Sequence, residues 1–122
     1  MATATLQASI VKPVTVLSTD QNTTTLALNS AIVYTEETRF TLALGTVTDS
    51  AVNFGSVTSA KVVMLRPTND ITIKINGSAT AMPVSGSAAA TGWFLLSNPT
   101  GGVTAITVTT TTSTNIEVLL LE

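Results

Sequence analysis

The chain has 122 residues and a net charge of −2 at neutral pH, and only 10% of its residues are charged, against roughly 25% in average globular domains. It contains no cysteine and no histidine, which excludes a disulfide framework and thiolate metal sites and removes the commonest general base. This length predicts one domain, and the slightly acidic balance offers no basic surface to nucleic acid or anionic lipid.

The N-terminal third predicts an arm followed by short strands. Residues 1–9 are small and polar apart from Leu6, so we expect an N-terminal arm over 1–9 that attaches to a neighbouring subunit, and a single sandwich domain over 10–122. Pro13 interrupts the apolar stretch that begins at Ile10, which indicates a strand edge or a break. Further short strands are predicted at 24–28 and 31–35, separated by Asn29 and Ser30.

Alternation of apolar and polar residues returns after the charge cluster at 36–39. Phe40, Leu42 and Leu44 alternate with small or polar residues, which predicts a strand with one buried face. The pattern loosens over 46–59, where Phe54 and Val57 are expected to anchor a long loop or an irregular strand.

The clearest local pattern lies at 61–84. After an apolar run at 61–65, Ile71, Ile73 and Ile75 occupy alternate positions, as in a half-buried strand. Asn76 and Gly77 follow directly, and both tolerate the positive φ of a tight hairpin turn. This segment predicts β structure and indicates no chemistry.

The last third of the chain predicts three more strands. Residues 93–96 form an apolar run that begins with Trp93 and is expected to be buried, and residues 103–109 alternate with Ile106 and Val108 inward. Residues 116–121 form a strongly apolar last strand. No helical period is sustained, so the chain is expected to be all-β, an antiparallel sandwich or jelly roll of about eight to ten short strands.

Catalytic groups are hard to find. A nucleophilic serine has no histidine to activate it, and Lys61 or Lys74 could act as the base only with a specific placement. Glu36 and Glu37 are adjacent and would point to opposite faces of a strand, and a pair of Glu36 with Glu117 depends on the strand pairing. We therefore expect no enzymatic activity and no metal or cofactor.

Two weaker binding patterns have structural interpretations that we favour. Three pairs of Asx residues could offer oxygen ligands to calcium, but none has a dense carboxylate loop, and turn formation is the better interpretation. The pairs are Asp20 with Asn22, Asp49 with Asn53, and Asn69 with Asp70. Trp93 and Tyr34 could stack on a sugar or a base, but a core position is favoured.

The C-terminal two thirds resembles small β-sandwich virion structural proteins of tailed bacteriophages, of the capsid decoration or cement type. The resemblance rests on AKVVMLRPTNDITIKINGSATAMPV and GWFLLSNPTGGVTAITVTTTTSTNIEVLLLE. It implies a protein that binds the outer capsid surface across capsomer junctions, often as a trimer, and stabilises the shell. A neck, tail or baseplate component is the alternative within this class. From a different class, a carbohydrate-binding sandwich would need two or three exposed aromatic residues, and aromatic residues make up 4% of this chain.

The low charge and abundant threonine also indicate association. Either threonine hydroxyls solvate the surface, or other subunits cover much of it; we favour the second and expect a homo-oligomer, preferably a trimer. The expected partners are other copies and the major capsid protein or other virion proteins, without nucleic acid or membrane. The expected location is the virion, after synthesis in the host cytoplasm, since the N-terminus lacks the features of a signal peptide. The candidate interface residues are Leu6, Ile10, Ile116, Val118 and Leu120, the last three belonging either to the core or to the interface.

Overall fold

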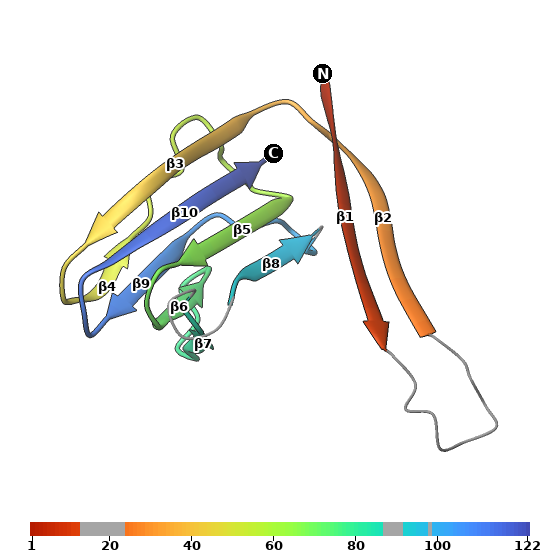
Figure 1. Cartoon of the computed structure of the whole chain (residues 1–122). Helices are drawn as coiled ribbons and strands as arrows, with labels where there is room; N and C mark the ends of the chain where they lie inside the picture. Colours follow the sequence, from red (N-terminus) through yellow and green to blue (C-terminus); the bar gives the residue numbers. More distant parts are fainter. Residues whose placement is uncertain (13–23, 87–91, 98) are drawn as a thin grey trace, which may run out of the picture. The chain divides into compact units, whose positions relative to one another are not determined.

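The computed structural model describes residues 1–12, 24–86, 92–97 and 99–122, and it describes the side chains of these residues except those of 6–12 and 24–30. This part of the chain contains ten strands and no helix (Figure 1). The strands are β1 Ala2–Lys12, β2 Thr24–Tyr34, β3 Glu37–Leu44, β4 Val47–Ala51, β5 Val62–Pro67, β6 Ile71–Ile75, β7 Met82–Val84, β8 Phe94–Ser97, β9 Ile106–Thr110 and β10 Thr114–Leu121.

The chain divides into two compact units, residues 1–34 and residues 35–122. This division differs from the predicted boundary between residues 9 and 10. Residues 2–9 are the first part of β1, because every residue from Ala2 to Lys12 pairs with a residue of β2. The attachment of residues 1–9 to a neighbouring subunit stays a prediction.

The first unit is an antiparallel hairpin of β1 and β2. Its register runs from Ala2 opposite Tyr34 to Lys12 opposite Thr24. The predicted interruption at Asn29 and Ser30 does not occur, because both residues take part in the ladder, opposite Gln7 and Leu6. The two short strands predicted at 24–28 and 31–35 are therefore one continuous strand.

The second unit is a sandwich of two four-stranded antiparallel sheets, which confirms the predicted fold class. The first sheet has the strand order β3-β10-β5-β8, and the second has the order β4-β9-β6-β7. The pairings are nested: β3 pairs with β10, β4 with β9, β5 with β8, and β6 with β7. Strands β7 to β10 thus run back along strands β3 to β6, each pairing with one of them. The pairings of β10 with β5 and of β9 with β6 complete the two four-stranded sheets.

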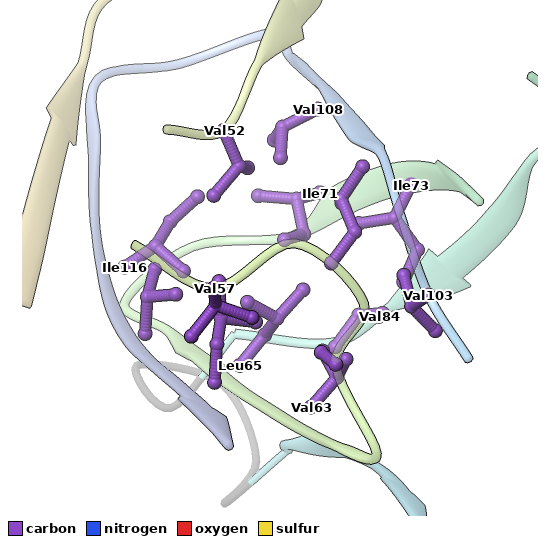
Figure 2. Packing of buried hydrophobic residues seen from close by; sticks show 14 residues of the cluster. Val52, Val57, Val63, Leu65, Ile71, Ile73, Val84, Val103, Val108 and Ile116 are labelled. Carbon is purple, nitrogen blue, oxygen red and sulfur yellow. The ribbon is translucent and has the colours of Figure 1, made fainter. Parts of the chain in front are cut away.

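The core lies between these two sheets and is almost entirely aliphatic. In β6 and β9, the alternate residues Ile71, Ile73, Ile106 and Val108 are at most 3% exposed. In Figure 2, Ile71, Ile73 and Val108 lie together with Val52, from the segment after β4, and with Leu65 of β5. Each such side chain contributes about 1.5–3 kcal/mol when it is fully buried. The alternation therefore decides which face of each strand points inward.

The predicted turn at Asn76 and Gly77 forms, but the tight hairpin does not. Both residues have positive φ, 51° and 72°, and the turn closes with Ser78 N donating to Ile75 O at 2.9 Å. The returning strand is β7, and its pairing with β6 begins only at Ile73 opposite Met82. Asn76 N donates to Ala105 O on the β9 side of β6, and residues 78–81 form a loop between the turn and β7.

The loose pattern over 46–59 corresponds to β4 and a long loop. The register of β4 with β9 shifts between Val47 and Ser50, which makes β4 an irregular strand. In the loop, Val57 is 3% exposed and belongs to the core, and Phe54 packs against it, as predicted.

Candidate interaction surface

The acidic side chains of the sandwich form separate ion pairs and hydrogen bonds and do not gather at one site. Glu36 and Glu117 do not form a pair, since Glu117 lies opposite Thr41 in the β10–β3 register. Glu117 forms an ion pair with Arg66 at 2.8 Å, and Glu36 accepts a hydrogen bond from Ser56 Oγ at 2.9 Å. Across the described residues, no three Asp or Glu side chains gather where they could hold a metal ion.

Of the four Asx residues of the sandwich named as calcium candidates, Asn53, Asn69 and Asp70 lie in loops, as the favoured interpretation expects, and Asp49 lies within β4. Asn53 Oδ1 accepts from Gly55 N at 2.9 Å, and Asp49 pairs with Lys74 at 2.9 Å. Asn69 Nδ2 donates to Ser113 O, and Asp70 Oδ1 accepts from Gly86 N. The pair of Asp20 and Asn22 lies outside the described residues.

Glu122 connects the end of β10 to the loop after β4. Its carboxylate accepts hydrogen bonds from Thr58 N at 2.6 Å and from Thr58 Oγ1 at 2.7 Å. The backbone and side-chain hydrogen bonds from Thr58 hold the pKa of the Glu122 carboxyl below its ordinary value of 4.5. This contact stabilises a loop at the surface and offers no reactive group.

The predicted interface residues of the last strand belong to the core. Ile116, Val118 and Leu120 are at most 1% exposed and lie in the hydrophobic cluster between the sheets, so they cannot contact another subunit in the folded chain. The sequence allowed either a core or an interface role for this strand, and these three residues belong to the core. Leu6 and Ile10 lie in β1, opposite Ser30 and Leu26, and their side chains are outside the described residues.

The surface that can contact a partner includes the outer face of the first sheet. Leu95, Met64 and Leu119 are in register across β8, β5 and β10, and all three are half-buried. We call these three residues the apolar row. Their neighbours on the same face, Val62 and Leu121, are 4% exposed and do not belong to the cluster between the sheets.

Trp93 also lies on this outer face, and the prediction that it is buried is wrong. It precedes β8 and is 49% exposed, although a buried position was expected. The reason is the alternation along β8: Phe94 and Leu96 pack against the core, so Trp93 and Leu95 are turned to the other face. The predicted buried strand at 93–96 is thus a half-buried strand at the end of the first sheet.

A hollow of about 320 Å³ lies on the first sheet next to the apolar row. Its lining combines Met64 and Leu119 of the apolar row with Arg39, Thr41 and Glu117. An aliphatic floor with one cation and one anion at its rim is typical of a surface that contacts another protein.

Comparison with protein-family models, with curated proteins and with solved structures finds no match to this chain. The part of the chain that the structure describes contains no helix that could cross a lipid bilayer.

Proposed function

We propose that the chain is a structural protein of a tailed-bacteriophage virion, and specifically a head decoration protein that binds the outer capsid surface and stabilises the shell. The observation that carries the proposal is the apolar row, with Trp93 beside it, on the outside of the sandwich. Aliphatic and aromatic residues on an outer face are typical of surfaces that bind other proteins.

The strand order supports this class of protein. The nested pairing of β3 to β10 supports classifying the sandwich as a jelly roll, an architecture that recurs in viral capsid proteins. The resemblance of residues 60–84 and 92–122 to small phage sandwich proteins points in the same direction. A fold alone does not define a function, so the outer face and not the architecture carries the proposal.

The proposal is tested on the intact particle. A cryo-EM map is expected to show this chain in many copies on the outer capsid surface, with the outer face of the first sheet against another subunit. Copies confined to a ring in the neck, tail or baseplate would favour the alternative position. Absence of the chain from purified particles would overturn both.

One observation favours a second candidate, a carbohydrate-binding sandwich. Trp93 is the one aromatic side chain among the described residues that is both large and about half exposed, and an exposed indole can stack on a sugar. Screening against a glycan array tests this, with Trp93→Ala as the control. Binding that the Trp93→Ala variant loses would favour this candidate over the virion role.

A further inference from the structure

Three of the four edge strands of the sandwich carry features that oppose pairing with another strand. β3 has the charged residues Glu37 and Arg39, and β7 has Pro83 at its centre. In β4 the register shifts, and Asp49 has a φ of 50°. Charge, proline and irregularity are the devices by which proteins protect sheet edges.

The fourth edge strand, β8, has none of these features. Its sequence is FLLS, without charge or proline, and its ladder with β5 is regular from Val62 opposite Ser97 to Leu65 opposite Phe94. Phe94 and Leu96 face the core but are only half-buried. A strand with an apolar face that paired here would complete the burial of both side chains.

The hairpin of β1 and β2 has the complementary properties. Neither residues 2–11 nor residues 24–34 contain a charged residue or a proline. By register, Ala4, Ala8 and Ile10 stand opposite Ile32, Leu28 and Leu26 at alternate positions, with Leu6 opposite Ser30 between them. The sequence pattern therefore makes one face of the hairpin mostly apolar. A two-stranded hairpin is only marginally stable alone, and a third strand or an apolar surface is what it needs.

We propose that the hairpin of one copy adds a strand to the β8 edge of a second copy. Main-chain hydrogen bonds along β8 supply the contact, and the apolar face of the hairpin covers Phe94 and Leu96. Because the donor hairpin and the acceptor edge are different surfaces, the contact is head-to-tail, and we expect its repetition to close a ring such as a trimer. The contact needs only these two surfaces and does not require a role in a virion.

The donor can be the hairpin of a second copy or the hairpin of the same chain. We commit to the second copy, because charged residues are only 10% of this chain and so low a charge indicates that other subunits cover part of its surface.

Cross-linking distinguishes the two cases, because the chain has no cysteine of its own. Thr3→Cys on β1 and Ser97→Cys on β8 are both exposed positions. The two single variants are mixed and treated with a short bismaleimide, and linked peptides are identified by mass spectrometry. A link between residue 3 of one variant and residue 97 of the other is expected. Absence of this link, or a link formed only within one chain carrying both cysteines, would overturn the proposal.

A charge placed on the edge tests the same contact by affinity. Ser97→Lys on β8 is expected to weaken self-association, measured by sedimentation equilibrium, at least about tenfold. Ala43→Lys is the matched control, since residue 43 is exposed on the same face of the same sheet but at the protected β3 edge. Equal effects of the two substitutions, or a wild-type protein that stays monomeric at high concentration, would contradict the proposal. Neither result bears on whether the protein is found on a virion.

Discussion

Asn76 shows how one side chain can join two segments of the sandwich. Its Oδ1 accepts from Thr104 N at 2.8 Å and Ala105 N at 3.2 Å, and its Nδ2 donates to Gly102 O at 3.0 Å. Its φ of 51° is one that asparagine adopts more readily than most residues. The same residue thus makes the turn after β6 and holds the segment that leads into β9.

We predict that Asn76→Ala lowers the free energy of unfolding by about 2–3 kcal/mol, because it removes several hydrogen bonds and leaves alanine in a left-handed conformation. Urea unfolding measures the loss. Asn76→Gly is the matched control: glycine adopts the left-handed φ without strain, so its loss should be smaller and reports the hydrogen bonds alone. A loss of less than about 0.5 kcal/mol for the alanine variant would show that the network is not stabilising.

Glu122 gives the stability a defined dependence on pH. Hydrogen bonds from Thr58 keep the pKa of its carboxyl lower in the folded than in the unfolded chain. The unfolded state therefore binds the proton first as the pH falls, so the stabilisation is present above the ordinary value of 4.5 and is lost as the pH falls through the folded pKa.

We therefore predict that the difference in Tm between the wild type and Glu122→Gln shrinks as the pH is lowered from about 7 to about 3. Thermal melts across this range measure it. Thr58→Val removes the hydroxyl donor but keeps the backbone donor, and should reduce the pH dependence without abolishing it. A Tm difference that stays constant over the whole range would mean that the Thr58 contact does not stabilise the charged carboxylate.

At the scale of the elements, the residue pattern predicts strands where one face is strongly apolar. Ile71–Ile75 is a strand as predicted, and Val108 and Ile116 point inward in β9 and β10. The pattern fails where side chains are small: residues 2–9 form a strand because they pair with β2, and Ala and Thr carry too little apolar mass to mark a face. It also fails for Trp93, whose position depends on the alternation set by Phe94 and Leu96.

Two isoleucines of β6 allow a controlled test of the core. Ile73 is fully buried and Ile75, two residues along the same face, is half-buried. We predict that Ile73→Ala lowers the free energy of unfolding by about 2–5 kcal/mol, because it removes buried methyl groups and leaves a cavity. Ile75→Ala should lower the free energy of unfolding clearly less, and urea unfolding measures both losses. Equal losses at the two positions would indicate that the end of the sandwich near Ile75 is packed as tightly as its centre.

At the scale of the whole molecule, the candidate surface depends on strand pairing, which the sequence does not reveal. β3 at residues 37–44 pairs with β10 at residues 114–121, and no local signal connects segments so far apart. Leu95, Met64 and Leu119 become one row only through the β8–β5–β10 order. From the sequence alone the last strand could be core or interface, and its pairing on both sides with β3 and β5 makes it core.

The division into two units predicts how a truncation acts. All residues of the hydrophobic cluster, and those packed against it, lie between Phe40 and Leu120, so the sandwich core contains none of the described side chains of the hairpin. Deleting residues 2–9 should therefore change the Tm of the sandwich by less than about 3 °C, a shift that corresponds to under 1 kcal/mol. Under the proposed role as a head decoration protein, the deletion should also weaken retention on the virion, because it removes most of β1 and leaves β2 without its partner.

Thermal melting and co-sedimentation with purified particles measure the two effects of this deletion separately. The control is a variant in which a glycine-serine segment of equal length replaces residues 2–9. It restores the length of the chain but lacks strand-forming residues, so it should be lost from particles like the deletion. If the control is retained and the deletion is not, the length of the segment matters and its strand does not. If instead the truncated protein unfolds, residues 2–9 are needed for folding of the sandwich itself, and the hairpin cannot be a separate element for contacts between subunits.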